Sequence, residues 1–349
     1  MSKDSRRRVQ FPAPGEAEVI TEAAPSPGPG EVRVRTQYSA ISPGTERLVY
    51  QGNVPESLDA DPSIEALQGD ALSYPISYGY SCVGEVEALG KGIEGGWEGT
   101  KVFSFQPHVS RFVSTPDALV RLPDSVELTD AVMIPSVETA VNLVMDGRPM
   151  VGETVLVLGQ GVVGLLTTRL LADHPLGTLV AVDPTASRRA HSESAGAVAV
   201  ESVDDLGQVD GYIAASPSPS SSPSDTERAD LVYELTGQPA VLNDAVQCTG
   251  YAGRIVIGSW YGTKTAPVDL GGHFHRSRMR IISSQVSTID PSHRGRWTKD
   301  RRMCTVLNLL PEVTPSQFIS DWVEIDEAPS AYEQLAADSP MLQPVFEYD

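Results

Sequence analysis

Three glycines in the middle of the chain have the spacing of a phosphate-binding turn. Gly159, Gly161 and Gly164 form the pattern G-x-G-x-x-G in the segment GQGVVG. The first glycine permits a tight bend, the second lets the backbone approach a pyrophosphate, and the third lets a helix pack closely on a strand. The next helix would offer its first backbone N–H groups, from Val162 and Val163, to the phosphates. A glycine-rich turn that binds no nucleotide is the alternative interpretation.

The residues around this turn strengthen the prediction of a dinucleotide site. An apolar strand, TVLVLG, precedes the turn, and a second strand, TLVAVD, ends at Asp183, 19 residues after Gly164. A carboxylate at that place accepts hydrogen bonds from the ribose hydroxyls and repels a 2′-phosphate, so NAD is expected rather than NADP. NADP stays open, because Arg188 and Arg189 follow closely and can either hold a 2′-phosphate or form a solvated helix face.

Strands and helices alternate around the turn, which predicts an α/β fold with a doubly wound parallel sheet of the Rossmann type. Before residue 135 the chain has short alternating strands separated by Pro and Gly turns, typical of a β-rich domain. The polar segment 216–227 is expected to be an exposed loop, and residues 318–338 a strand followed by a helix. We therefore predict a dinucleotide domain at 136–305 and a second domain formed by 1–135 and 306–349.

Composition limits the classes of function. The 349 residues carry a formal net charge of −20, with 46 acidic and 26 basic side chains, which argues against generic nucleic-acid binding. Neither a secretory signal nor an apolar run long enough for a membrane span is present, so we expect a cytoplasmic protein without a membrane role. An acidic surface suits a high-salt cytoplasm, so a halophilic source is one hypothesis and an ordinary acidic protein the other.

Beyond these patterns, the chain resembles the medium-chain dehydrogenase/reductase superfamily, the zinc-type alcohol dehydrogenase-like proteins, over nearly its whole length. The resemblance rests on PSPGPGEVRVRTQYSAISPGTE, PISYGYSCVGEVEALG, GETVLVLGQGVVG and ADLVYELTGQPAVLNDAVQCTGYAGRIVIGSWYG. Within it, ISPGTE, YGYS, FQPH and RIISSQV are most similar to a zinc-lacking branch related to bacteriochlorophyllide dehydrogenases.

The resemblance implies an NAD(P)-dependent oxidoreductase whose β-rich domain is GroES-like and catalytic. It places the nicotinamide in a cleft between the domains, with Thr139 packed against it, and includes Thr236 among the cofactor-binding residues. The substrate would be a small molecule, and dimers or tetramers are usual for such proteins. A secondary alcohol and its ketone is our preferred substrate pair, and an enone or quinone reductase or a non-catalytic NAD(H) sensor or subunit are the alternatives.

The zinc ligands of the family are replaced in this chain. Ile41-Ser42-Pro43-Gly44-Thr45-Glu46 stands where the family has its first cysteine ligand, and Gly79-Tyr80-Ser81 where it has Gly-His-Glu. The third ligand falls near Pro135, and the stretch after Phe105 lacks the four cysteines of the structural lobe. Because a catalytic zinc needs three protein ligands, we expect no metal. An unconventional site using Glu46 with His108, or His273 with His275 on one face of a strand, is the alternative.

Hydrogen-bond donors must then polarise the substrate carbonyl. The resemblance places Tyr80 at the position of the family's histidine ligand. Its side chain is either a proton donor and acceptor or a packed aromatic ring. Thr45 is a proton relay or a turn residue, and Glu46 a general base or the partner of an arginine. His108 titrates near neutral pH or is structural, and Glu138 lines the cleft or forms a salt bridge at the domain junction.

Eight of the 26 basic residues lie within residues 276–302, with only Asp290 and Asp300 against them. They are Arg276, Arg278, Arg280, Arg294, Arg296, Lys299, Arg301 and Arg302. Arginine clusters bind carboxylates and phosphates, so an anionic substrate is one interpretation. Contacts to the cofactor pyrophosphate, ion pairs at a subunit interface and a plain solvated face are the others.

Overall fold

The computed structural model describes residues 5–55, 72–210, 212, 228–337 and 341–349. This chain divides into two compact units, one formed by 1–135 and 304–349 and the other by 136–303. The polar segment 216–227, expected to be an exposed loop, lies outside the described residues. None of the described helices is long and apolar enough to span a bilayer.

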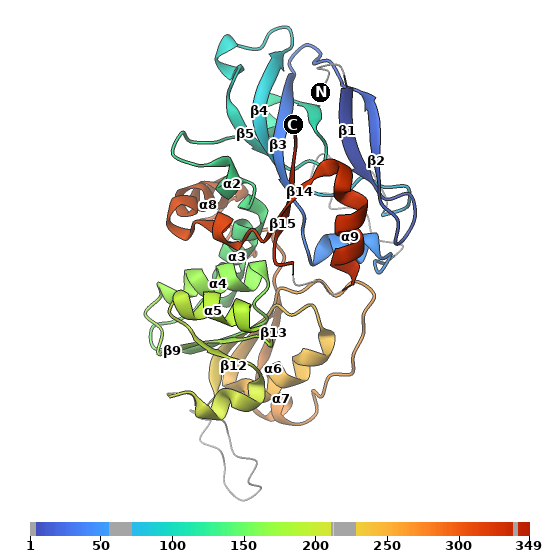
Figure 1. Ribbon diagram of the computed structural model, residues 1–349. Helices are drawn as coiled ribbons and strands as arrows, with labels where there is room; N and C mark the ends of the chain where they lie inside the picture. The colour runs from blue at the N-terminus through green and yellow to red at the C-terminus, as the bar shows by residue number, and fades with distance from the viewer. Residues whose placement is uncertain (1–4, 56–71, 211, 213–227, 338–340) are drawn as a thin grey trace, which may run out of the picture. The chain divides into compact units, whose positions relative to one another are not determined.

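The first unit is built on a mixed seven-stranded sheet with strand order β14-β15-β3-β4-β5-β7, in which β6 also pairs with β3 (Figure 1). Strands β14 and β15 are parallel, and the other pairs are antiparallel. A separate two-stranded ribbon is formed by β1 and β2. The strands and helices of this unit are β1 (Ser5–Gln10), β2 (Glu18–Ala23), β3 (Val32–Ala40), α1 (Thr45–Tyr50), β4 (Cys82–Leu89), β5 (Lys101–Ser104), β6 (Arg111–Ser114), β7 (Val120–Arg121), α2 (Leu128–Ala131), β14 (Asp321–Glu324), α9 (Ala328–Ala336) and β15 (Pro344–Glu347).

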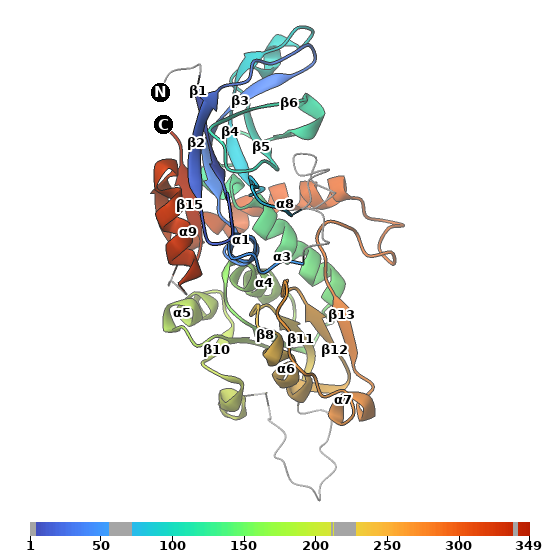
Figure 2. The ribbon, with the colours of Figure 1, turned by 90° about the vertical axis from the view of Figure 1, so that its right-hand side faces the viewer.

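The second unit contains a six-stranded parallel sheet with strand order β10-β9-β8-β11-β12-β13, visible in Figure 2. Its elements are β8 (Thr154–Leu158), α4 (Val162–Ala172), β9 (Thr178–Val182), α5 (Ala186–Ser194), β10 (Val198–Val200), β11 (Ala229–Glu234), α6 (Leu242–Cys248), β12 (Thr249–Ile257), α7 (His273–Arg276) and β13 (Arg280–Ser283). Helices α3 (Ile134–Gly147) and α8 (Lys299–Val313) run through the two boundaries between the units.

Both faces of the parallel sheet are covered, as its continuous apolar strands require. Along β8, Leu156 and Leu158 belong to an apolar cluster that includes Val246 of α6. The alternate residues Val155 and Val157 belong to a second cluster with side chains of α3 and α4. The predicted α/β fold, a parallel Rossmann-like sheet with a separate sheet domain, is confirmed.

Candidate functional site

The glycine turn joins β8 to α4 and needs glycine at two of its three positions. Gly159 has φ +90°, and a Cβ there would lie 2.9 Å from the Leu235 carbonyl carbon and from Thr236 Cα. A Cβ on Gly164 would lie 2.0 Å from the Gly159 carbonyl oxygen. The turn is therefore packed tightly against both its own helix and the segment that follows β11.

Gly161 differs from the other two glycines, because a Cβ there would meet nothing within 4 Å. It is the N-cap of α4, so Val162 and Val163 fall in the first turn of the helix. Backbone N–H groups in a first helical turn have no partner inside the helix, and the helix dipole favours negative charge beside them. The open approach at Gly161 and these two amides fit the pyrophosphate of a dinucleotide.

Asp183 closes the turn from the end of β9. Its buried carboxylate accepts hydrogen bonds from the backbone N–H of Gln160 at 2.8 Å (Oδ2) and of Thr185 at 2.8 Å (Oδ1). Arg188 Nη1 lies 3.8 Å from Oδ2. The guanidinium of Arg189 instead donates to the carbonyl oxygens of Asp183 and Pro184. The structure thus brings Asp183 and Arg188 to the glycine turn, whereas Arg189 contacts the backbone after β9.

Gln160, which the sequence did not identify as a site residue, fixes the turn through the hydrogen bonds of its side chain. Its side chain is fully buried, where Oε1 accepts from the Thr168 hydroxyl at 3.0 Å and the Ser192 hydroxyl at 2.9 Å, and Nε2 donates to the Val157 carbonyl. The turn is thereby fixed to both α4 and α5. The sequence held one signal, a polar residue between two glycines of an otherwise apolar segment.

The two threonines predicted at the cofactor lie on different elements of the same unit. Thr236 lies two residues after the end of β11, beside Gly159, and its backbone N–H donates to Glu234 Oε1 at 2.8 Å. Thr139 is half-buried on α3. Its neighbour Glu138 is buried and forms an ion pair with Arg302, at 2.9 Å from Nη2 to Oε1. Burial raises the pKa of Glu138, and Arg302 partly offsets that rise.

A second cluster lies inside the mixed-sheet unit and joins Glu46 to His108. Both side chains are fully buried, and His108 Nε2 lies 2.9 Å from Glu46 Oε2. Glu46 also accepts from the Tyr332 hydroxyl at 2.5 Å and the Ser42 N–H at 2.7 Å. His108 Nδ1 lies 2.6 Å from Ser39 Oγ. The expectation that Glu46 pairs with an arginine is wrong, because α1 directs it into a core where its partners are the Tyr332 hydroxyl, the Ser42 amide and this imidazole.

Gly79, the residue before Tyr80, packs directly against His108 of this cluster. A Cβ on Gly79 would lie 2.7 Å from the His108 ring, and its φ of +111° also favours glycine. The half-buried ring of Tyr80 makes an edge contact with Tyr78, with ring centroids 6.2 Å apart. Thr45 is the first residue of α1, next to Glu46, rather than part of a turn. All four catalytic candidates therefore belong to the same unit, and a direct hydrogen bond joins Glu46 to His108.

The basic segment has a mixed structure. Arg302 is 1% exposed and also binds the Asn142 side chain at 2.5 Å, so it serves the core of its unit. Arg294 and Arg296 are exposed on the loop before α8, and Arg301 lies over the Trp297 ring. Seven of the eight basic side chains thus remain outside the core.

The residues do not form an evident metal site. No group of three His, Cys, Asp or Glu side chains able to hold an ion occurs among the residues the structure describes. Both ring nitrogens of His108 and both carboxylate oxygens of Glu46 already have protein partners, so this pair does not fit a zinc ligand set. The expectation of His273 and His275 on a strand is wrong. They lie on the short helix α7, where side chains two residues apart point in different directions.

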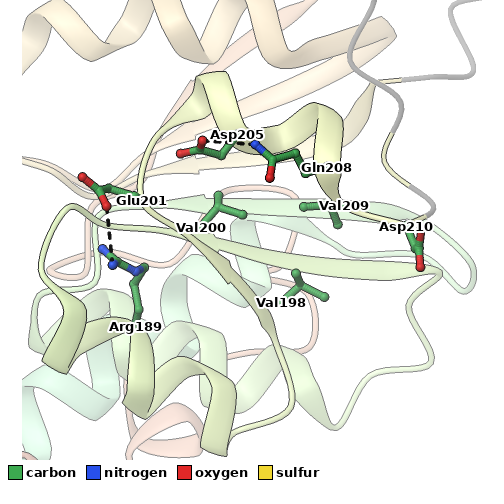
Figure 3. A pocket seen from close by; sticks show the side chains of 8 residues that line it. All are labelled: Arg189, Val198, Val200, Glu201, Asp205, Gln208, Val209 and Asp210. Atoms are coloured by element: carbon green, nitrogen blue, oxygen red, sulfur yellow. Dashed lines mark hydrogen bonds and ion pairs between the residues drawn. The ribbon is translucent and has the colours of Figure 1, made fainter.

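A shallow hollow of about 520 Å³ lies beside β10, and among its lining residues only Arg189 was considered above for the cofactor (Figure 3). It is lined by Arg189, Val198, Val200, Glu201, Asp205, Gln208, Val209 and Asp210. Arg189 and Glu201 form an ion pair across it at 3.7 Å.

Several known proteins with similar sequences are named dehydrogenases, although no family model matches the chain. A 2-dehydro-3-deoxy-L-galactonate 5-dehydrogenase of Pseudoalteromonas atlantica is 26% identical over 300 residues, covering 77% of this chain and 80% of that protein. The (R,R)-butanediol dehydrogenase of Bacillus subtilis is 25% identical over 279 residues, covering 70% and 75%. The 2-desacetyl-2-hydroxyethyl bacteriochlorophyllide A dehydrogenase of Cereibacter sphaeroides is 24% identical over 275 residues, covering 74% of each chain.

Solved structures give the same result for the fold. The 2R,3R-butanediol dehydrogenase of Bacillus subtilis has a TM-score of 0.76 at 18% identity, covering 99% of this chain and 100% of that one. An alcohol dehydrogenase of Escherichia coli in complex with NADH has a TM-score of 0.75 at 18% identity, with the same coverage. The chain is similar to the medium-chain, zinc-type alcohol dehydrogenases. This similarity extends over both units.

Proposed function

We propose that this chain is an NAD-dependent oxidoreductase that interconverts a secondary alcohol and its ketone without a catalytic zinc ion. The observation that carries the proposal is the turn at the end of β8, with its two obligatory glycines, its open approach at Gly161 and Asp183 closing it. When bound, the nicotinamide exchanges a hydride with the substrate carbon, and the protein orients and polarises the reactants. The dehydrogenase relatives support the class of reaction.

The preference for NAD rests on Asp183. Its carboxylate is held beside the glycine turn by two backbone amides, where a negative charge disfavours a 2′-phosphate. Arg188, 3.8 Å away, partly neutralises it and supports a weaker interaction with NADP. A thermal-shift titration with NAD, NADH, NADP and NADPH tests this preference, because a ligand at a hundred times its Kd adds about 2.7 kcal/mol of stability. Stabilisation by NADP(H) alone would contradict the assignment.

The proton chemistry is proposed for the mixed-sheet unit. Tyr80 donates a proton to, or accepts it from, the substrate oxygen, and Thr45 relays it. The buried pair His108 and Glu46 forms the inner end of this relay, through the hydrogen bond at 2.9 Å. The replacement of the family's ligand positions by Ile41–Glu46, Tyr80 and Pro135 supports catalysis without zinc. Metal analysis of the purified protein tests this, and one equivalent of zinc per chain would contradict it.

Three finer features belong to the same proposal. An anionic group on the substrate would bind the exposed Arg294 and Arg296, and charge reversal of both should raise KM if so. A homodimer or homotetramer is proposed by analogy, to be measured by sedimentation. The similarity to a bacteriochlorophyllide dehydrogenase supports the zinc-lacking branch, but not a pigment substrate.

Two alternatives predict different measurements. An enone or quinone reductase of the same fold would oxidise NADH with activated alkenes and leave secondary alcohols untouched. A non-catalytic NAD(H) sensor would show the thermal shift but no turnover on alcohols, ketones or enones. Following NADH absorbance over such a substrate panel separates the three.

A further inference from the structure

A buried carboxylate ends β11 and has no role in the proposal above. Glu234 is fully buried, although it follows the apolar residues Leu231, Val232 and Tyr233. Its Oε1 accepts from the N–H of Thr236 at 2.8 Å and from the hydroxyl of the same residue. Burying a carboxylate is costly unless hydrogen bonds compensate it, so these contacts call for an explanation.

The other carboxylate oxygen reaches a different loop. Tyr261, which lies after β12, donates its hydroxyl to Glu234 Oε2 at 2.5 Å. The ring of Tyr261 is half-buried, so its hydroxyl points inward from a loop that is partly exposed. Burial and the bond to Glu234 raise the pKa of Tyr261, which keeps the hydroxyl protonated and donating.

Further hydrogen bonds fasten the same two loops to each other. The Gly237 N–H donates to Ser259 Oγ at 2.8 Å, and Lys264 Nζ donates to the Gly237 carbonyl oxygen at 3.0 Å. The Gly258 N–H donates to the Glu234 carbonyl oxygen at 3.1 Å. Glu234 is thus the charged centre of a network that sets the loop after β12 relative to the loop after β11.

The network lies at the carboxyl edge of the parallel sheet, beside the glycine turn. Strand β11 is the neighbour of β8, and Gly159 packs against Leu235 and Thr236. This sheet consists of two halves, and in doubly wound folds each half binds one mononucleotide across the point where the strand order reverses. Asp183 belongs to the half formed by β8, β9 and β10, so the Glu234 network belongs to the half that receives the nicotinamide nucleotide.

We propose that Glu234 and Tyr261 are positioning residues for the nicotinamide half of the bound dinucleotide. Glu234 holds the Tyr261 loop in place, and that loop in turn fixes the nicotinamide nucleotide against the sheet edge. The inference rests on the proposed function, because it requires a bound dinucleotide. It adds a prediction that dinucleotide binding alone does not make, a selective effect on one half of the ligand.

Tyr261→Phe is the first variant to test, because it removes one hydroxyl from a half-buried ring and leaves Thr236 bonded to Glu234. Glu234→Gln is the second. NADH binding is followed by nicotinamide fluorescence, and binding of AMP, which contains only the adenosine half, by calorimetry. Each variant should raise the Kd for NADH about tenfold, which corresponds to about 1.4 kcal/mol, and change the Kd for AMP less than twofold.

Glu153→Gln is the matched control. Glu153 is also a buried carboxylate of the same unit, but it precedes β8 at the opposite sheet edge and pairs with Arg254 at 2.6 Å. This variant should lower the thermal midpoint without changing the Kd for NADH more than the Kd for AMP. Equal losses for NADH and AMP in Tyr261→Phe, or an unchanged Kd for NADH, would overturn the inference. If the wild-type protein binds both AMP and NADH and no variant changes either Kd, dinucleotide binding stands and only the positioning role fails. A wild-type protein that binds neither ligand would remove the proposed function itself.

Discussion

His108 and Glu46 lie 62 residues apart in the sequence and 2.9 Å apart in the structure, with both side chains fully buried. Each has further partners, Ser39 for the imidazole and Tyr332 with the Ser42 amide for the carboxylate. Satisfied polar networks of this kind rigidify a core, but removing one member leaves the others unpaired. We therefore expect this pair to contribute to the free energy of unfolding, whether or not it takes part in catalysis.

His108→Ala should lower the free energy of unfolding by about 3–5 kcal/mol, because it leaves the Glu46 charge buried without its imidazole partner. Urea denaturation measures the change. Asp173→Ala is the control, since it removes an exposed ion pair with Arg169 and should alter stability little. A His108→Ala protein as stable as the control would show that the network contributes nothing.

Two glycine variants should distinguish the role of the turn in stability from its role in NADH binding. Gly164→Ala places a methyl group 2.0 Å from the Gly159 carbonyl oxygen, so α4 must shift, at a cost of about 1–3 kcal/mol. Gly161→Ala meets open space and should fold normally, yet weaken NADH binding about tenfold by occupying the approach of the pyrophosphate. Thermal melts and NADH titrations of both variants check this. Normal NADH affinity in Gly161→Ala would argue against phosphates at this turn.

Tyr80→Phe should lower kcat about a hundredfold, the usual loss when a general acid is removed. The thermal midpoint should change little, because the ring and its contact with Tyr78 are kept. Tyr78→Phe, which alters the buried neighbour instead, is the control and should retain most activity. Initial rates on the best substrate of the panel decide between the two tyrosines, and a wild-type rate in Tyr80→Phe excludes it from proton transfer.

The three thiols should react with maleimide in a fixed order. Burial raises the pKa of Cys82 to about 12 and that of Cys248 to about 11. Raised values mean that almost none of either thiol is thiolate at pH 8, and their reactive fraction increases only as the pH approaches 11. Cys304 is exposed on α8. Mass spectrometry should show one modified thiol in the native protein at pH 8 and three in urea; fast native labelling of Cys82 would contradict the structure.

Salt should stabilise the protein if its acidic surface is an adaptation to high salt. At a net charge of −20 the folded chain repels itself, and at 1 M salt the Debye length falls to about 3 Å. We expect the thermal midpoint and the activity to rise between 0.1 M and molar KCl, measured by scanning calorimetry and initial rates. Maximal activity at the lowest salt would favour an ordinary acidic protein.

Features set by neighbouring residues could be predicted from the sequence. The spacing of Gly159, Gly161 and Gly164 and the apolar strand before them determine a turn between β8 and α4, because the steric demands of a tight bend are local. Apolar periodicity likewise predicted β8 and β9 of the parallel sheet and the strand and helix at 318–338. The helix α8 and the short strands β10 and β15 were missed, since β10 is specified by pairing with β9, and β15 by pairing with β14 and β3, rather than by their own short sequences.

The tertiary structure alone decided which polar side chains share a site. Spacing along the chain says nothing about partners 62 residues apart, as for Glu46 and His108, or 164 apart, as for Glu138 and Arg302. It also gave no partner for Glu234, whose contact with Tyr261 depends on the adjacency of β11 and β12. A buried charge is tolerated only where the fold supplies hydrogen bonds, so these pairs are consequences of chain packing, whereas the glycine turn is a consequence of local sequence.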